Sequence, residues 1–183
     1  MTTLFIARLQ PIHEGHKKVI EKYSEEYEDF QLVIGSANKS REQENPLTFE
    51  ERKEIVQSCF SNLRIEALKD EAKDKEGNQT WVSKIIERLD PDKIISRNDL
   101  VIELFRDQEG VEVVKQDLVD RDVYSGTEVR RRIRSGEEWR YLVPECAKDS
   151  VEKYIDIIKE TGIQYEFKPG WKKENAYYDT AEK

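Results

Sequence analysis

The sequence predicts an α/β fold: a Rossmann-like, doubly wound parallel sheet of about five strands, followed by C-terminal helices. Short apolar runs, of the kind that a strand buried on both faces requires, alternate with longer segments of helical periodicity. This alternation implies parallel strands joined by right-handed crossovers, with helices on both faces of the sheet. In the strand order 3-2-1-4-5, the first strand lies centrally beside the fourth, and ligands bind in the crevice at their carboxyl ends.

The first half of the chain is expected to contain three strands and two helices. The strands are residues 3–7, 30–35 and 64–68, of which the last has the weakest pattern. After the first strand, one helical stripe is formed by Val19, Ile20, Tyr23 and Tyr27. Thr48 and Glu51 have the spacing of a capping box, which predicts a second helix that extends through Phe60.

The next part of the chain continues the alternation. Residues 93–96 and 111–114 are expected to be the fourth and fifth strands. Asn78 is a residue type that can cap a helix, and the helix predicted after it carries Trp81. Residues 98–105 are expected to be helical as well.

Three helical signals follow the fifth strand. Ser125 and Glu128 repeat the capping-box spacing at the start of an arginine-rich segment. Residues 135–138 have the pattern of a further capping box. Residues 145–160 predict one long amphipathic helix.

The charge of the chain limits the classes of function. The chain has 183 residues, of which 38% are charged, and a formal net charge of −8 at pH 7. This charge argues against a nucleic-acid binder that works through a broad basic surface. It leaves room for a small anionic ligand, because a few focused cations can serve a pocket in an acidic protein.

We expect one domain over residues 1–162 and a C-terminal tail over residues 163–183, where no clear period is present. No apolar stretch approaches the ~20 residues that cross a bilayer, and the N-terminus lacks the basic start and long apolar region of a signal peptide. Cys59 and Cys146 show no metal-type spacing. We therefore expect two reduced thiols in a cytoplasmic protein that has no membrane partner.

Both histidines of the chain lie in the run ARLQPIHEGH, residues 7–16, directly after the first expected strand. At the start of a helix, His13 and His16 share a face near backbone N–H groups that carry partial positive charge. Gly15 has no side chain, so a phosphate could approach the backbone closely. The alternative is two surface histidines without a ligand. Zinc is disfavoured, because no cysteine or third histidine is available to complete a site.

Two further segments have residue types that bind ligands. Ser125, Thr127 and Arg130 lie at an expected helix start, where hydroxyl groups, backbone N–H groups and a guanidinium can bind phosphate. The alternative there is an ordinary cap followed by a solvated basic face. The spacing of Trp81 favours a core position, although its indole face could also stack on a cationic ring. Expected core residues are Phe5, Ile94 and Trp139.

The first of these segments resembles a known motif. The pattern Arg8-x-Gln10-Pro11-x-His13-x-Gly15-His16 is similar to the phosphate-binding motif of the nucleotidyltransferase α/β (HxGH) superfamily, and more narrowly to that of archaeal-type nicotinamide-mononucleotide (NMN) adenylyltransferases. The resemblance continues in the same order over residues 3–160. Its further segments are residues 35–37, 44–48, 51–52, 74, 78, 81–83, 124–132 and 142–144. Ala7 and Arg97 depart from the pattern, because the family has glycine at both positions.

This resemblance implies transfer of the adenylyl group of ATP to NMN, which gives NAD and pyrophosphate. The implied catalytic residues are Arg8, His13, His16 and Arg130. The implied contacts to ATP and its phosphates are Ala7, Arg8, Gln10, His13, Gly15, His16, Ser125, Thr127 and Arg130. The implied contacts to NMN are Gly35, Ser36, Asp74, Asn78, Trp81 and Asn98. The resemblance also implies a homo-oligomer and Mg²⁺, a divalent cation that the ATP phosphates carry in without a protein metal site.

Other functions stay open on the sequence alone. Sister nucleotidyltransferases that act on FMN, phosphopantetheine or glycerol phosphate share the HxGH chemistry, but they are not expected to share Asp74, Asn78 and Trp81. A class I aminoacyl-tRNA synthetase fragment has a similar histidine element, but this chain is short and acidic for a tRNA enzyme. The third alternative is a non-catalytic nucleotide-binding regulator, against which the intact His13 and His16 argue.

Overall fold

The structure, a computed structural model, describes residues 1–72, 74–116 and 123–163. Five parallel strands form one sheet in the order β3-β2-β1-β4-β5, which confirms the predicted strand order. The strands are β1 (Thr2–Ala7), β2 (Asp29–Ile34), β3 (Arg64–Ala67), β4 (Lys93–Ser96) and β5 (Glu112–Lys115). Of the predicted tail, residues 163–183, all but Ile163 at the end of α7 lies outside the described residues.

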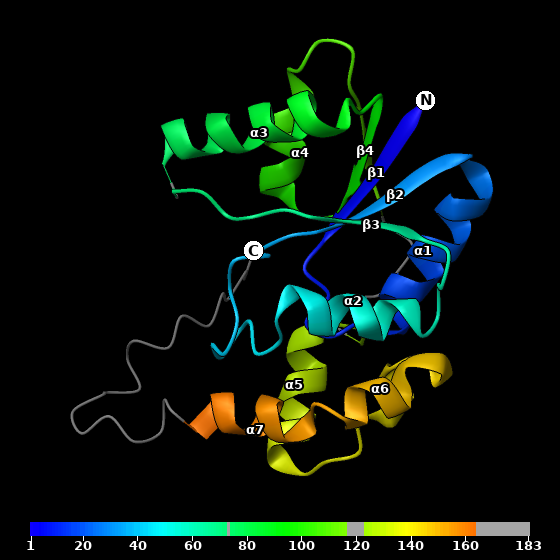
Figure 1. Cartoon of the computed structure of the whole chain (residues 1–183), viewed down its shortest axis with the longest axis vertical. Helices are drawn as coiled ribbons and strands as arrows, with labels where there is room; N and C mark the ends of the chain where they lie inside the picture. Colours follow the sequence, from blue (N-terminus) through cyan, green and yellow to red (C-terminus); the bar gives the residue numbers. More distant parts are fainter. Residues whose placement is uncertain (73, 117–122, 164–183) are drawn as a thin grey trace.

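Helices cover both faces of the sheet (Figure 1). One face carries α3 (Lys75–Leu89) and α4 (Asp99–Arg106). The other carries α1 (Glu14–Glu26), α2 (Phe49–Gln57), α5 (Gly126–Ser135), α6 (Lys148–Glu152) and α7 (Ile155–Ile163). Each face has its own core, because successive side chains of a strand point to opposite sides: Leu4 packs with α3 and α4, and Phe5 with the other helices. The predicted core residues Phe5, Ile94 and Trp139 are all buried.

The centre of the sheet is the place where the strand order reverses. β1 pairs with β2 on one side and with β4 on the other, so that Phe5 lies opposite both Leu32 and Ile95. The loops that follow Ala7 and Ser96 therefore leave the sheet from neighbouring points. This is the topological switch point at which open α/β sheets bind ligands.

Two of the three predicted capping boxes start helices, and they form to different degrees. At the start of α2, the Thr48 hydroxyl accepts from the backbone N–H of Glu51, and the Glu51 carboxylate accepts from the N–H of Thr48. This helix ends at Gln57, before the predicted Phe60. At α5, the Ser125 hydroxyl accepts from the N–H of Glu128, but the Glu128 carboxylate binds arginines further along the helix.

Three other predicted helix boundaries were wrong. The N-cap of α3 is Asp74 and not Asn78, so the helix begins at Lys75. No helix begins at residues 135–138, because Gly136 takes a left-handed conformation with φ 68° and ends α5. Residues 145–160 do not form one helix. They form three elements, η2 (Glu145–Ala147), α6 and α7, and a turn at residues 153–154 separates the last two. Another short 3-10 helix, η1 (Arg140–Leu142), precedes them.

The cysteines also differ from the expectation. Cys59, just after α2, and Cys146, in η2, form a disulfide, so the prediction of two reduced thiols was wrong. The two residues are 87 positions apart in the sequence. Because α6 packs against α2, the Cα atoms of the two cysteines lie 5.1 Å apart. The spacing of the cysteines in the sequence does not reveal this long-range contact.

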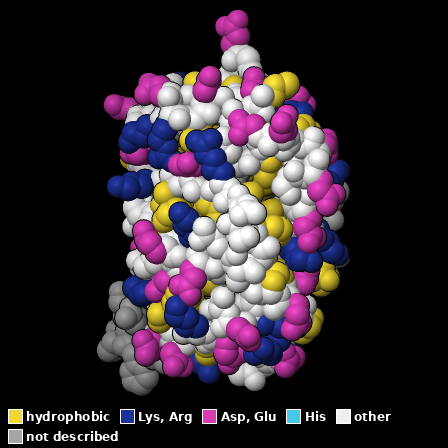
Figure 2. Space-filling view, turned by 45° about the vertical axis from the view of Figure 1, so that its right-hand side comes forward, with side chains coloured by type: hydrophobic (Ala, Val, Ile, Leu, Met, Phe, Trp, Pro, Cys, Tyr) yellow, Lys and Arg dark blue, Asp and Glu magenta, His cyan; other side chains and the backbone are white. Residues whose placement is uncertain are grey.

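The surface carries charges of both signs. In Figure 2, Lys and Arg side chains alternate with Asp and Glu side chains over the visible face, without a broad basic area. Among the described residues, the helices are too short or too polar for one to cross a lipid bilayer.

Candidate active site

A cavity of about 830 Å³ opens at the carboxyl edge of the sheet, beside the first turns of α1 and α5. The residues predicted to contact ATP all line it: Ala7, Arg8, Gln10, His13, Gly15, His16, Ser125, Thr127 and Arg130. So do most of those predicted to contact NMN: Gly35, Ser36, Asn78, Trp81 and Asn98. Asp74 is not among the lining residues. One cavity thus brings together nearly all of both predicted sets.

The two imidazoles lie against each other at the start of α1. The ring centroids of His13 and His16 are 3.6 Å apart, with 27° between the ring planes. His13 is the N-cap, and its Nδ1 accepts from the backbone N–H of His16 at 3.3 Å. Because Nδ1 accepts, neutral His13 carries its proton on Nε2 and can donate it to a ligand. The Nδ1 of His16 is buried and has no partner among the described residues.

Burial sets the charge of this pair. It lowers the pKa of His13 to about 4, although an ordinary histidine titrates near 6.5. Burial and the neighbouring His13 together hold the pKa of His16 well below the ordinary value. Both rings are therefore neutral at pH 7 in the free protein, and an entering polyanion would favour their protonated forms.

Two arginines supply permanent positive charge. Arg130, on α5, is only 6% exposed, and its Nη1 donates to the backbone carbonyl of Gln10 at 2.7 Å. Burial lowers its pKa to about 10, so it stays cationic at neutral pH. Its Nε is buried without a partner among the described residues. Arg8 is more exposed and pairs with the Glu44 carboxylate at 3.5 Å, a partner for which an anionic ligand would compete.

Some predicted phosphate contacts instead shape the cavity. The Gln10 side-chain amide donates from Nε2 to the carbonyl of Leu47 at 2.9 Å and accepts at Oε1 from the N–H of Leu47 at 3.1 Å. Both ends of this amide are therefore already paired. The Ser125 hydroxyl caps α5. Gly126 is required there, because a Cβ atom at this position would lie 2.9 Å from the carbonyl oxygen of Gln10.

The opposite end of the cavity is formed by α3 and the start of α4. Trp81 is half-buried, and its ring makes an edge contact with Phe105 at a centroid distance of 5.9 Å. Asn78 lies one turn before Trp81 and also lines the cavity. Asn98 caps α4 by accepting from the backbone N–H of Leu100 at 3.0 Å. This end therefore presents a flat aromatic ring and side-chain amides.

Asp70 is a cavity residue that sequence reasoning missed. Both of its carboxylate oxygens lie 3.0 Å from the hydroxyl of Ser36, which donates to them, and Lys39 pairs with it at 3.4 Å. Its position three residues after the short strand β3, at the carboxyl edge of the sheet, was the available signal. Asp70 thus ties the loop after β3 to the loop after β2.

Comparison with known proteins identifies the family. Residues 4–132 match the cytidylyltransferase-like family. A protein of Methanosarcina barkeri named nicotinamide-nucleotide adenylyltransferase is 38% identical over 157 residues, which are 85% of this chain and 86% of that protein. A protein of the same name from Methanococcus aeolicus is 40% identical over 146 residues, 79% of this chain and 84% of that protein. The chain belongs to the nicotinamide-nucleotide adenylyltransferase family.

Solved structures agree with this family's fold. A bifunctional NMN adenylyltransferase/ADP ribose pyrophosphatase from Francisella tularensis, complexed with AMP and a manganese ion, superposes with a TM-score of 0.71. The alignment covers 91% of this chain and 53% of that one at 18% sequence identity, so it supports the fold alone.

Two residues that were noted as departures from the resemblance also face the cavity. Both Ala7 and Arg97 line it. The Ala7 carbonyl accepts from the backbone N–H of Gly35 at 3.0 Å, which joins the ends of β1 and β2. Among the described residues, no cluster of three or more His, Cys, Asp or Glu side chains has the arrangement of a metal site.

The lowered histidine pKa predicts how stability depends on pH. His13 binds a proton less readily when folded than when unfolded, so its contribution to stability is complete above about pH 6.5 and is lost as the pH falls toward 4. A shift of this size corresponds to about 3 kcal/mol. In thermal melts from pH 7 to pH 4, we expect His13→Asn to lose less Tm than the parent chain, because asparagine can still cap α1 but does not titrate. Equal losses in both proteins would contradict this origin.

Proposed function

We propose that the protein transfers the adenylyl group of ATP to NMN, with NAD and pyrophosphate as products. The observation that carries this proposal is a single cavity with two chemically different ends. His13, His16 and Arg130 present donors suited to a polyphosphate at one end. Trp81 and Asn78 present an aromatic face and an amide suited to a cationic pyridinium ring and its carboxamide at the other. The names of the archaeal relatives support the same reaction.

The reaction is an in-line displacement at phosphorus. An oxygen of the NMN 5′-phosphate forms a bond to the α-phosphorus of ATP, and the bond from that phosphorus to the bridging oxygen of the β-phosphate breaks. The attacking phosphate is already an anion at neutral pH, so the protein needs no strong base. Its tasks are to align the two substrates and to stabilise the charge on the departing pyrophosphate.

The residues of the polyphosphate end divide these tasks. We assign Arg8, His13, His16 and Arg130 to the triphosphate. His13 and His16 donate through imidazole N–H groups, and Arg130 adds a cation from a fixed position on α5. The backbone at Ala7 and Gly15 and the first turn of α5, with Ser125 and Thr127, complete this end.

The residues of the aromatic end bind NMN in this proposal. We assign Gly35, Ser36, Asn78, Trp81 and Asn98 to it. Asp74 was expected to contact the carboxamide, but its carboxylate starts α3 by accepting from the N–H of Gly77 at 2.7 Å. We propose that Asp74 acts through α3, whose first turns carry Asn78 and Trp81.

The divalent cation enters with ATP. The solved structure from Francisella tularensis is a complex with AMP and manganese, and a cation of this type neutralises charge on a triphosphate. We propose Mg²⁺ bound mainly to the phosphate oxygens, since hard cations prefer such ligands. We further propose a cytoplasmic homo-oligomer that acts on small molecules and not on nucleic acid.

One assay tests the reaction and its alternatives together. The protein is incubated with Mg-ATP and, separately, with NMN, FMN or phosphopantetheine, and pyrophosphate release and the dinucleotide product are measured. We expect rapid pyrophosphate release, with NAD as the product, when NMN is the acceptor and not when FMN or phosphopantetheine is. Preference for another acceptor would assign the chain to a sister reaction, and no release with any acceptor would favour a nucleotide-binding regulator.

Replacing the indole tests the NMN end. We expect Trp81→Ala to raise KM for NMN by roughly 2- to 30-fold, the range of one cation–π contact, while KM for ATP stays close to that of the parent. Trp81→Phe retains a ring and should have a smaller effect. Initial rates with each substrate varied in turn measure both constants. Equal increases for ATP and NMN would show that Trp81 shapes the whole cavity and does not bind NMN.

A further inference from the structure

Arg52 is a buried cation that none of the assigned roles explains. Its side chain is fully buried, with 0% exposure, on α2. The guanidinium donates only to backbone carbonyl groups: from Nε to Thr48 at 3.1 Å, from Nη1 to Arg8 at 2.7 Å and to Gly35 at 2.8 Å, and from Nη2 to Ser36 at 3.1 Å. Among the described residues, no carboxylate accepts a hydrogen bond from it. Asp70 and Glu50 favour its charge only from beyond hydrogen-bond distance. A buried charge without a directly paired carboxylate is costly, so the presence of Arg52 here calls for a specific role.

Apart from Thr48, the cap of its own helix, the carbonyls that Arg52 holds belong to two different substrate loops. Arg8 lies in the loop between β1 and α1, which carries proposed ATP contacts and is called the ATP loop here. Gly35 and Ser36 begin the loop between β2 and α2, which carries proposed NMN contacts and is called the NMN loop. One nitrogen atom, Nη1, donates to both Arg8 and Gly35. The two loops are thus joined through a single planar group.

The backbone next to these carbonyls is in an unusual conformation. Leu9 has φ 54° and Ser36 has φ 51°, both in the left-handed region that residues other than glycine rarely adopt. The carbonyls of Arg8 and Gly35 stand immediately before these two residues. Such conformations persist only where the surrounding structure holds them, and here the Arg52 guanidinium holds both.

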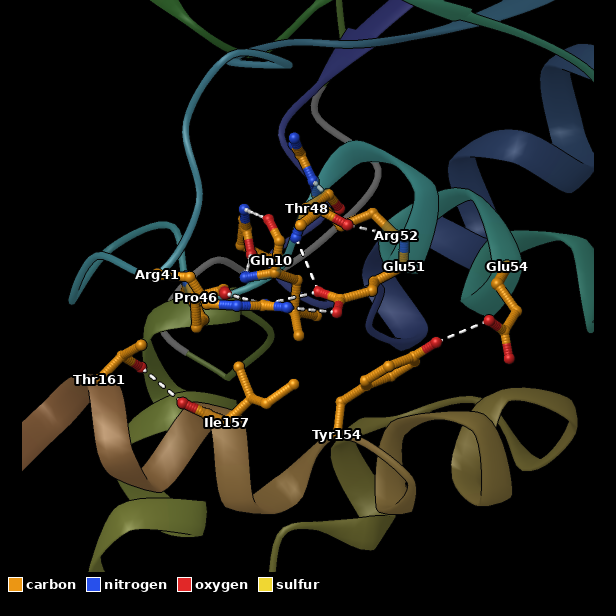
Figure 3. Close-up of polar contacts among 11 residues, drawn as sticks. Gln10, Arg41, Pro46, Thr48, Glu51, Arg52, Glu54, Tyr154, Ile157 and Thr161 are labelled. Carbon is orange, nitrogen blue, oxygen red and sulfur yellow. Dashed lines mark hydrogen bonds and ion pairs between the residues drawn. The ribbon is translucent and has the colours of Figure 1, made fainter.

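The helix that carries Arg52 is itself well anchored. In Figure 3, Arg52 lies beside Thr48 in the first turn of α2, where Glu51 closes the capping box and pairs with Arg41. On the outer side of the same helix, Glu54 accepts from the hydroxyl of Tyr154 at 2.6 Å (Figure 3). A group on such a rigid element can fix the position of what it binds.

We propose that Arg52 is a positioning residue that sets the spacing between the ATP loop and the NMN loop, and thereby the alignment of the attacking phosphate with the α-phosphorus. This inference rests on the proposed function. A displacement of about 1 Å between two reacting groups can cost about 10²-fold in rate. Arg52 needs no contact with either substrate to have this effect, because each loop binds its own substrate.

The test separates alignment from binding. Arg52→Lys keeps the positive charge but replaces the planar fork with one ammonium group, which cannot hold carbonyls of both loops in the same geometry. We expect kcat to fall by about 10²-fold. The dissociation constants of ATP and of NMN, measured one at a time by calorimetry, should change by less than about threefold. Arg88→Lys is the matched control, because Arg88 also donates to a strand-end carbonyl, that of Ala67 at 2.8 Å, but lies outside the cavity.

Each outcome has one meaning. A parent protein that forms no NAD from ATP and NMN overturns the proposed function before any variant is compared. If the parent is active, an unchanged kcat in Arg52→Lys overturns the positioning role. A loss of kcat in Arg52→Lys that is matched by equal losses in affinity for ATP and NMN overturns it as well. If Arg52→Lys does not fold, Arg52→Gln, which is neutral but keeps two N–H donors, takes its place. Misfolding of both variants would make Arg52 a folding residue and overturn the inference.

Discussion

His16→Ala is expected to lower kcat by about 10²- to 10³-fold, the loss that follows removal of one donor to a developing charge. The imidazole of His16 stacks on His13 at a centroid distance of 3.6 Å, and its buried Nδ1 has no partner among the described residues. A ring held in this way gains its strongest hydrogen bond when charge builds up on the polyphosphate. The contact should therefore strengthen in the transition state, so that kcat falls more than the affinity for ATP.

The fold should survive this replacement. The hydrogen bond that caps α1 uses the backbone N–H of His16 and the side chain of His13, so alanine at position 16 keeps it. Steady-state rates of NAD formation, together with thermal melts, measure the two effects separately. Lys17→Ala is the control, because Lys17 pairs with Glu21 along α1 outside the cavity. Near-normal turnover of a folded His16→Ala protein would remove His16 from the catalytic set.

The features that sequence reasoning predicted correctly depend on local patterns. The parallel sheet follows from apolar runs that alternate with helical stripes, and a buried run such as residues 3–7 needs no long-range information to be recognised. The cavity could be located because His13 and His16 directly follow the central strand. A motif beside a switch point is placed by the topology itself.

The features that it missed depend on contacts between distant parts of the chain. Arg52 reads as an ordinary charged residue on a helix, since the carbonyls of Arg8 and Gly35 that it binds lie 44 and 17 positions away. The contact of Asp74 with NMN stays a prediction of the resemblance, whereas its role as the cap of α3, seen in the structure, was not predicted. Residue type alone does not distinguish these partners.

The cysteines show the same limit and lead to the largest expected effect on stability. The expectation of free thiols rested on compartment and spacing, whereas the structure joins Cys59 to Cys146. A bond between residues 87 positions apart removes much freedom from the unfolded chain, and the chain-entropy relation gives about 4–5 kcal/mol. We expect a reducing agent to lower Tm by about 8–20 °C, given a shift of about 2–4 °C per kcal/mol for a chain of this size.

The disulfide should affect stability without affecting the chemistry. Neither cysteine lines the cavity, so kcat at low temperature should be the same before and after reduction. The double variant Cys59→Ser, Cys146→Ser should melt like the reduced parent and show no response to reductant. Thiol titration of the unfolded, unreduced parent should find no free thiols, whereas two free thiols and a Tm insensitive to reductant would contradict the bond. Because the bond joins the end of α2 to η2, a loss of kcat on reduction would instead mean that the C-terminal helices hold Arg52 in place through α2.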